Sequence, residues 1–369
     1  MSRELLTRAE CNALRGLAII GIFLHNYCHW LGPVVKENEY TFTRHNVDVF
    51  SQVLSHPDAN LPLHLFSFFG HYGVPIFLFL SAFGLVNKYE LASPRRVPVM
   101  PFLRYHYLKL FKMMIVGFVA FVLVDAITPR SWHYDVVKVV SQLLMLNNLL
   151  PDPDHMIWPG PYWFFGLMLQ LYIVYRLVLY KRHWGWTAGL TLVCLGIQLC
   201  LMPESEELNR YRYNFMGGML PFGAGLLYAR YGGRWIGQVG LKGRQLFGGF
   251  LLCSALAVVL SYDFVAWAVV PLAVCGASVC LVKWLAGLSG GVPGMAFDAL
   301  EWMGSISAAL FVCHPIIRKV LIPISRQDDI YTGLILYIMA SICVAWLFKE
   351  LMKRIPNPKM KLKDEAEGD

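Results

Sequence analysis

Charged residues are scarce in this chain. Only 15% of the 369 residues are Asp, Glu, Lys or Arg, whereas 57% are hydrophobic, and the mean hydropathy is +0.50. A globular interior cannot hide so much apolar surface, so an ordinary soluble protein is excluded. The composition predicts an all-α, polytopic membrane protein.

Paired cysteines are also lacking. The chain has nine cysteines, an odd number, and most of them lie inside apolar runs. Cysteines in such runs are typical of small apolar packing residues and do not indicate a disulfide framework. No cluster of His, Cys and carboxylate residues has a usable ligand spacing along the sequence, so we expect no metal.

Acidic residues are outnumbered, with 24 Asp and Glu against 32 Lys and Arg. The basic residues gather in short stretches between apolar runs, as the positive-inside rule requires, so the net charge of +8 does not indicate a nucleic-acid partner. The pattern predicts about ten transmembrane helices with both termini cytoplasmic. It divides the chain into one transmembrane domain, 1–353, and a charged cytoplasmic tail, 354–369. The expected helices are 13–31, 71–88, 103–126, 163–180, 184–202, 214–229, 246–262, 264–285, 299–320 and 331–352.

Two stretches between these helices are unusual. Residues 32–70 form a polar connection longer than an ordinary link, which suggests an outer lid or an acceptor-binding loop. Residues 136–150 are too few and too polar to span a membrane, so we expect a re-entrant or interfacial helix there. The first apolar stretch is not followed by a small-residue cleavage pattern, so it should remain as the first helix.

The stretch RGLAIIGIFLHNYCH, residues 15–29, contains the main candidate for chemistry. If it is helical, His25 lies about 15 Å along the helix from Arg15. Ionisable groups at this depth usually face a bundle interior or an aqueous cavity and mark reaction or transport pathways. His29 lies one turn further on nearly the same face, so two imidazoles could line one polar track. The alternative is that His25 is a buried histidine bonded to a neighbouring helix for packing.

Six stretches, taken in order, resemble the acyltransferase-3 family of membrane acyltransferases over residues 12–350. They are RGLAIIGIFLH, GVPIFLFLSAFGL, FLRYHYLKLF, PYWFFGLMLQLYIVY, PFGAGLLYAR and SISAALFVCHP. Each motif alone is weak, but six in the family's order are fairly specific. The chain departs from the family pattern in three places: nine residues instead of ten separate Arg15 from His25, His106 and Lys109 stand in the basic RxxR region, and Ala82 replaces a common Gly.

The resemblance implies a membrane O-acyltransferase in a bacterial inner membrane, as a single membrane domain with no fused SGNH-type domain. Such an enzyme would take an acyl group, expected to be acetyl, from cytoplasmic acyl-CoA. It would transfer that group to a hydroxyl of a sugar, polysaccharide or glycolipid at the outer face. The resemblance makes His25 the general base, with a covalent acyl-histidine route as an alternative. The rival function is a transporter or flippase for a lipid-linked sugar or small polar solute, although no internal repeat supports it.

The resemblance also indicates which residues would bind the donor. Fixed cations at helix ends suit phosphate recognition. The expected acyl-CoA-binding residues are Arg15, Arg104, His106 and Lys109. The alternative for all of them is that they only set the membrane topology.

The expected acceptor-side residues are His29, Trp163, Gln170, Tyr172 and His314. Gln170 is of special interest because an amide at membrane depth seeks a partner, and family members often carry an acid there. The alternative is that the aromatic residues and Gln170 belong to the interfacial belt and the packing, and that His314 is a capping or interfacial histidine.

Overall fold

The computed structural model describes residues 5–92, 96–235, 241–288, 290–327 and 329–360. Every regular element within these ranges is helical, which confirms the all-α prediction. The last long helix ends at Arg354, next to the predicted start of the tail, and most of the tail lies outside the described residues.

Each of the ten stretches expected to be transmembrane contains a helix. The long elements are α1 (Arg8–Cys28), α4 (Gly73–Val86), α5 (Val99–Ile127), α8 (Trp163–Val174), α9 (Trp184–Cys200), α11 (Phe215–Trp235), α12 (Gly243–Leu260), α14 (Val270–Ala286), α15 (Gly291–Gln327) and α16 (Ile330–Arg354). Short elements connect them: α2 (Arg44–Ser55), α3 (Leu61–Phe69), η1 (Gly70–Tyr72), η2 (Asn87–Leu91), α6 (Val136–Leu143), η3 (Asn147–Leu149), α7 (Pro153–Met156), η4 (Gly160–Tyr162), η5 (Tyr175–Leu179), α10 (Glu206–Tyr213) and α13 (Phe264–Trp267).

Six helical segments in the described part of the chain are long and apolar enough to cross a membrane. They are Leu61–Leu91, Val99–Ile127, Gly160–Leu179, Gly243–Leu260, Gly291–Gln327 and Ile330–Arg354. The apolar helices α9 and α14 are shorter, and the count of ten spans stays a prediction. These apolar helices indicate an integral membrane protein.

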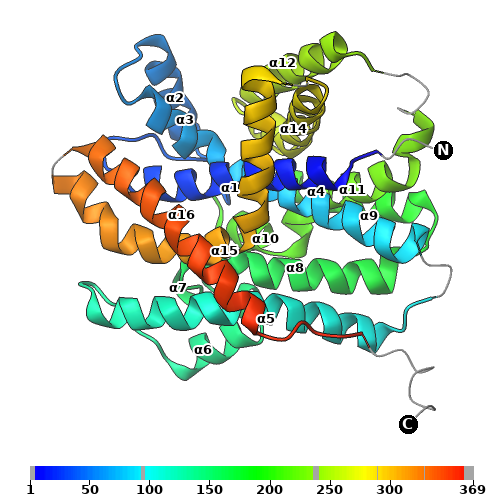
Figure 1. Cartoon of the computed structure of the whole chain (residues 1–369), viewed down its shortest axis with the longest axis horizontal. Coiled ribbons are helices and arrows are strands. Elements are labelled where there is room, and N and C mark those ends of the chain that lie inside the picture. The colour runs from blue at the N-terminus through cyan, green and yellow to red at the C-terminus, as the bar shows by residue number, and fades with distance from the viewer. Residues whose placement is uncertain (1–4, 93–95, 236–240, 289, 328, 361–369) are drawn as a thin grey trace.

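Helix α1 lies at the centre of the bundle, packed against α4 and α15 (Figure 1). Two glycines allow the close crossing with α15. A Cβ atom at Gly16 would collide with the carbonyl oxygen of Leu300, and one at Gly304 would collide with that of Asn12. Small residues at such a crossing let two membrane helices approach closely, so α15 fixes the position of α1.

The two unusual connections differ from the predictions. Residues 32–70 are not one long loop, because α2 and α3 occupy much of the stretch. These two short helices bury apolar residues, and the rings of Phe50 and Phe68 stack at 4.2 Å. Residues 136–150 do not form one helix. Met145 has a φ of 58°, which an α-helix cannot accommodate, and so it separates α6 from η3.

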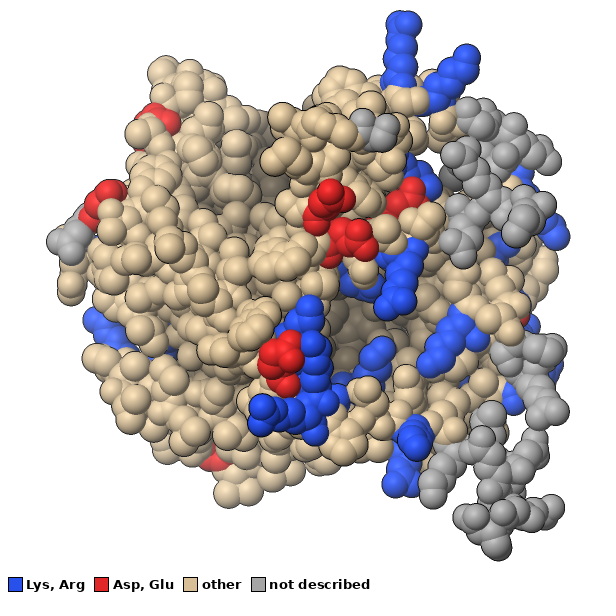
Figure 2. Space-filling view, viewed as in Figure 1, with Lys and Arg blue, Asp and Glu red and all other residues tan. Residues whose placement is uncertain are grey.

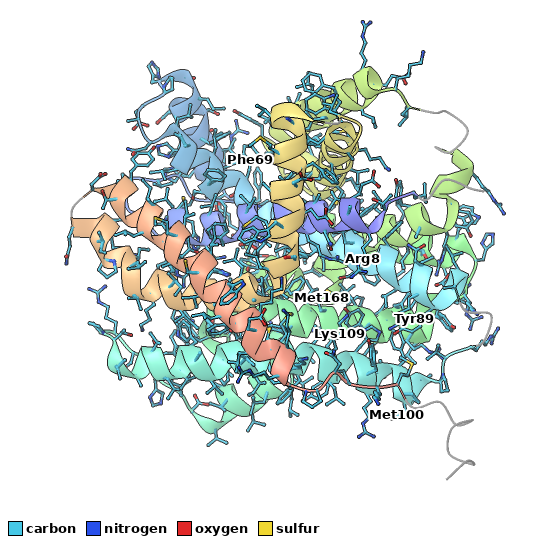
Figure 3. All side chains as sticks on the ribbon, viewed as in Figure 1. Arg8, Phe69, Tyr89, Met100, Lys109 and Met168 are labelled. Atoms are coloured by element: carbon cyan, nitrogen blue, oxygen red, sulfur yellow. The ribbon has the colours of Figure 1, made fainter. Side chains whose placement is uncertain are left out.

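The bundle has two distinct ends. We call the end where α1 stops and α4, α8 and α11 begin the cavity end, and the opposite one the basic end. On the face shown in Figure 2, most Lys and Arg side chains lie on the right, the side where α1 and α5 begin. Several of them border a hollow, in the part of the view where Figure 3 labels Lys109 and Met168.

Candidate functional site

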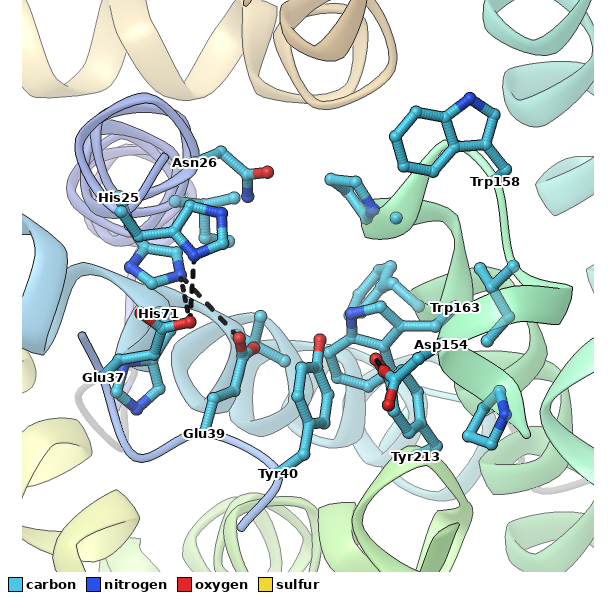
Figure 4. A pocket seen from close by; sticks show the side chains of 18 of the residues that line it. His25, Asn26, Glu37, Glu39, Tyr40, His71, Asp154, Trp158, Trp163 and Tyr213 are labelled. Carbon is cyan, nitrogen blue, oxygen red and sulfur yellow. Dashed lines mark hydrogen bonds and ion pairs between the residues drawn. The ribbon is translucent and has the colours of Figure 1, made fainter. Parts of the chain in front are cut away.

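A cavity of about 400 Å³ opens at the cavity end of the bundle. One wall carries His25 from α1, His29 at the C-cap of that helix, and Glu37 and Glu39 from the segment that follows. The opposite wall carries aromatic side chains and Asp154 (Figure 4). The predicted central histidine therefore lies beside an open space instead of in sealed packing.

His25 is held in one orientation by its first ring nitrogen. The Nδ1 atom lies 2.8 Å from the carbonyl oxygen of Ser67, which can only accept a hydrogen bond, so Nδ1 carries the proton. In the neutral ring the Nε2 atom then has a free lone pair. It lies 3.7 Å from Oε2 of Glu39 and 3.9 Å from Oε1 of Glu37, as the dashed lines in Figure 4 mark. Only 3% of the side chain is exposed.

His29 and Glu37 form the second pair in this wall. Nδ1 of His29 lies 3.0 Å from Oε1 of Glu37, and the rings of His29 and His25 are 4.8 Å apart. Burial would raise the pKa of the Glu37 carboxyl, but His29 and His25 beside it outweigh the burial and hold that pKa well below its usual range. Glu37 is therefore an anion at neutral pH. The prediction that His25 and His29 share one polar wall agrees with this geometry.

A third histidine, His71, was missed by the sequence reasoning. It lies on η1, and its ring centroid is 5.5 Å from that of His25. Gly70 allows this approach, because a Cβ atom there would lie 2.6 Å from Cβ of His25. Nothing in the spacing along the chain signals this neighbour, since it comes from packing between α1 and η1.

The opposite wall is aromatic. The rings of Tyr40 and Tyr213 stack at 4.0 Å, and Trp163 meets both edge-on. The hydroxyl of Tyr213 donates to Asp154 over 2.7 Å, which positions that carboxylate at the cavity. Trp163 thus lines the cavity as expected for an acceptor-side residue, and the expected acceptor-binding segment contributes Tyr40.

Arg318 of α15 provides the cation at this cavity. Its Nη1 atom donates to Oδ1 of Asn26 over 3.0 Å, and its guanidinium lies 4.9 Å from the ring centre of Trp30. Sequence reasoning missed Arg318. Its position one turn after His314, on the same helix face, could have revealed it.

Three of the expected acceptor-side residues are not among those that line the cavity. Gln170 bonds instead to the start of α11, donating to Asn214 and accepting from the backbone N–H of Phe215. Tyr172 packs against His106, with their rings 4.2 Å apart. His314 is fully buried and donates to the carbonyl oxygen of Leu310 in its own helix. Gln170 and Tyr172 thus have structural contacts, whereas the Nε2 atom of His314 is buried without a hydrogen-bond partner in the described part of the chain. Substrate contact by these three residues stays a prediction.

The four expected donor-binding residues lie away from the cavity lining. Arg104 and Lys109 are exposed on α5, and Arg15 is half-buried with its guanidinium 2.9 Å from Oδ1 of Asn12. His106 differs from them, because its ring is buried under Phe102 and Tyr172 and its Nε2 atom bonds to the hydroxyl of Tyr89. The ring of His106 thus packs inside the bundle, with its Nδ1 atom lacking a partner among the described residues, and donor binding by His106 stays a prediction.

The structure brings together one group of possible metal ligands that the spacing along the chain does not reveal, and the absence of a metal stays a prediction. His25, His29 and Glu37 bring one ligand atom each to within 4.8 Å of one another. The segment after α1 folds back on the helix, which places Glu37 beside two histidines that the linear sequence separates from it. These three groups fit a cation of the zinc class by donor type.

Comparison with known proteins gives one match. A family model described as an acyltransferase domain, acyltransferase-3, matches residues 8–350. No curated protein and no solved structure matches the chain. The match spans nearly all of the described helices and contains every residue of the cavity wall discussed above. The chain therefore belongs to the acyltransferase-3 family and is a membrane acyltransferase.

Proposed function

We propose that this membrane acyltransferase transfers an acetyl group from cytoplasmic acyl-CoA to a hydroxyl of a sugar, polysaccharide or glycolipid, with His25 as the general base. In this proposal the cavity end faces outward and the basic end faces the cytoplasm of a bacterial cell, in whose inner membrane the protein lies. The observation that carries the proposal is the fixed orientation of the His25 ring beside an open cavity.

The hydrogen bond from Nδ1 of His25 to Ser67 selects the reactive tautomer. It leaves the Nε2 lone pair as the proton acceptor. A hydroxyl that gives its proton to Nε2 converts the ring to an imidazolium, and Glu37 and Glu39 lie 3.9 Å and 3.7 Å from that atom. Their negative charge stabilises this imidazolium.

The reaction is an acyl transfer in which all atoms are accounted for. The hydroxyl oxygen attacks the thioester carbonyl carbon as its proton moves to Nε2 of His25. The new C–O bond forms, the C–S bond breaks, and the thiolate leaves with the proton that the imidazolium returns. General base catalysis of this kind contributes about 10²–10⁴-fold to the rate.

The opposite wall of the cavity supports a sugar acceptor. Aromatic faces pack against the apolar face of a sugar ring, and the walls contain the Tyr40 and Tyr213 stack and Trp163. The carboxylate of Asp154 can accept a hydrogen bond from a hydroxyl. A cavity of about 400 Å³ lies in the size range of small-molecule sites.

The basic end supports an anionic donor. Arg104 and Lys109 are exposed on α5, near the hollow bordered by Lys and Arg in Figure 2. Guanidinium and ammonium groups recognise phosphates, of which CoA carries three. We assign Arg15, Arg104 and Lys109 to this role and leave out His106, for the packing reason given above.

The test is thioester cleavage by purified protein in lipid nanodiscs, read as release of free CoA thiol from acetyl-CoA with a panel of sugar acceptors. We expect His25→Gln to reduce turnover by at least 10²-fold without changing the melting temperature appreciably. His45→Gln, a change of an exposed histidine on α2, is the matched control and should keep full turnover. Unchanged turnover in His25→Gln would overturn the proposal.

The same assay tests the role of the cluster His25, His29 and Glu37. We propose that these groups move protons and that the reaction needs no metal. Dialysis against a strong chelator should then leave turnover unchanged. A loss of turnover that added Zn²⁺ restores would contradict this assignment.

A further inference from the structure

A small side pocket opens from the main cavity beside His71. Its volume is about 40 Å³. The two spaces share five lining residues, which places the mouth of the side pocket next to the His25 ring. The shared residues are Glu39, Tyr40, His71, Val74 and Trp163.

His71 lies at this mouth with both ring nitrogens unused. Its side chain is 4% exposed, and neither Nδ1 nor Nε2 has a hydrogen-bond partner in the described part of the chain. A buried polar group left without a partner costs about 1–3 kcal/mol, so native structures rarely keep one without a reason. The ring lines both spaces, and a bound molecule there can supply the missing partner.

The lining of the side pocket is partly polar, since Arg212 contributes to it, and partly apolar. Leu78 of α4 and Leu167 of α8 belong to the apolar part, together with Gly218 of α11. A Cβ atom at Gly218 would lie 3.0 Å from Cδ1 of Leu78 and 3.1 Å from Cδ1 of Leu167. The two leucine side chains therefore lie close to Gly218 in the pocket lining, and their size limits the room there.

The volume fits a very short group. About 10–15 Å³ is needed for each water-sized group, so 40 Å³ takes roughly three. An acetyl group has three heavy atoms, namely the methyl carbon, the carbonyl carbon and the carbonyl oxygen. A sugar ring is far too large for this space, so the acceptor belongs in the main cavity.

We propose that the side pocket holds the acyl group of the donor during transfer, with an N–H of His71 donating to the thioester carbonyl oxygen. This inference rests on the proposed function and deepens it, because it makes Leu78 and Leu167 the residues that limit the acyl chain to two carbons. As the acceptor oxygen bonds to the carbonyl carbon, negative charge grows on the carbonyl oxygen. The N–H of His71 stabilises that charge until the C–S bond breaks and the carbonyl reforms.

His25 and His71 have different hydrogen-bond partners, which suit them to different roles in the reaction. His25 has its Nδ1 proton committed to Ser67, so its Nε2 is free to accept a proton. His71 has no such commitment, so one nitrogen can donate to the acyl carbonyl. Their ring centroids are 5.5 Å apart, so a base and a donor lie close enough to act on the same acyl group.

The first experiment measures the ratio of kcat/KM for butyryl-CoA to that for acetyl-CoA. We expect Leu167→Ala to raise this ratio about tenfold or more, since each methylene in an apolar pocket changes kcat/KM by about 10–200-fold. Leu78→Ala should do the same. The ratio is independent of how much of each variant folds. Leu171→Ala, the same truncation one turn further along α8 at a buried position outside the pocket lining, is the matched control and should leave it unchanged.

A substitution that makes the pocket smaller should shift the chain-length preference in the opposite direction. Gly218→Ala shortens the pocket, so kcat/KM for propionyl-CoA should fall relative to that for acetyl-CoA. An unchanged chain-length ratio in both leucine variants and in Gly218→Ala overturns the side-pocket inference. If His25 is still required for acetyl transfer in those assays, the proposed function stands while the inference fails.

The second experiment separates the donor role of His71 from a structural one. His71→Ala should lower kcat for acetyl transfer by about 10²–10³-fold, as the loss of an oxyanion donor does in other acyl-transfer enzymes. His71→Gln retains an N–H and should recover at least tenfold of that loss. If His71→Gln and His71→Ala show the same kcat while both remain folded, His71 does not donate to the carbonyl oxygen and this step is wrong.

Discussion

Two groups of buried charged residues, one at each end of this bundle, differ in their hydrogen-bond partners. At the basic end, Glu90 and Arg230 form a bidentate ion pair with contacts of 2.6 Å and 2.8 Å. Arg230 also donates to Thr187 and to the carbonyl oxygen of Leu179, and Glu90 accepts from Tyr175. At the cavity end, by contrast, polar atoms of His29, Glu37 and His71 are buried with no partner in the described residues.

The difference distinguishes structure from function. A buried pair whose bonding groups are satisfied ties helices together, and here it links η2, η5, α9 and α11. A buried cluster with unused lone pairs and N–H groups reduces stability unless a ligand completes it. Single buried nitrogens without a partner in the described part of the chain also occur near the basic end, at His106 and Arg176, but the cluster of them lies at the cavity, where we propose that a substrate binds.

The largest effect on stability should come from the basic end. Arg230→Met leaves the Glu90 carboxylate buried without its cation, which typically costs about 3–5 kcal/mol. We expect a large drop in melting temperature in detergent, with expression reduced as well. Arg234→Met, an exposed arginine on the same helix, is the control and should melt like the wild type. Equal melting temperatures for both variants would show that the pair is not structural.

Glu39 should show the opposite behaviour, affecting rate more than stability. Glu39→Gln removes one charge 3.7 Å from Nε2 of His25, so the imidazolium loses part of its stabilisation. We expect kcat to fall about tenfold, which corresponds to about 1.4 kcal/mol, with little change in melting temperature. Glu204→Gln, an exposed acid far along the chain, serves as the control. A change confined to melting temperature would place Glu39 with the structural charges.

Glu37 should show a pH-dependent effect on stability. Its pKa is lower in the folded protein than the ordinary value of 4.5, so its ionised form stabilises the fold above about pH 4.5 and this contribution is lost as the pH falls. The melting temperature of Glu37→Gln should therefore lie below that of the wild type at pH 7, and the gap should narrow below pH 4.5. A gap that widens on acidification would reverse the sign and contradict this assignment.

The smallest effect should be that of His106 on donor binding. His106→Phe keeps the ring packing against Phe102 and Tyr172 and loses one neutral hydrogen bond to Tyr89, worth about 0.5–1.5 kcal/mol. The KM for acetyl-CoA should stay the same. Lys109→Ala, at an exposed cation one turn away, should raise that KM several-fold. If His106→Phe raises the KM as much as Lys109→Ala, His106 contacts the donor after all.

Much of the fold was predictable from sequence, because apolar runs of membrane length and clusters of basic residues have a direct physical cause. All ten expected stretches contain helices. The segments that were missed, α2 and α3, are short; α2 is amphipathic and α3 is apolar. Their stability depends on contacts such as Phe50 with Phe68, and no local pattern reveals those.

The site was predictable only in part. The sequence by itself determined that a histidine at His25 would lie deep in an apolar helix with His29 one turn away, because helix geometry alone places both on one face. It also determined the family, since the six motifs span the chain in order. Only the tertiary structure decided that Glu37, Glu39 and His71 surround His25 and that Gln170, Tyr172 and His314 do not. That choice depends on how the segment after α1 folds back and on how closely Gly70 lets η1 approach α1, and such contacts between distant parts of the chain leave no periodic signal in the sequence.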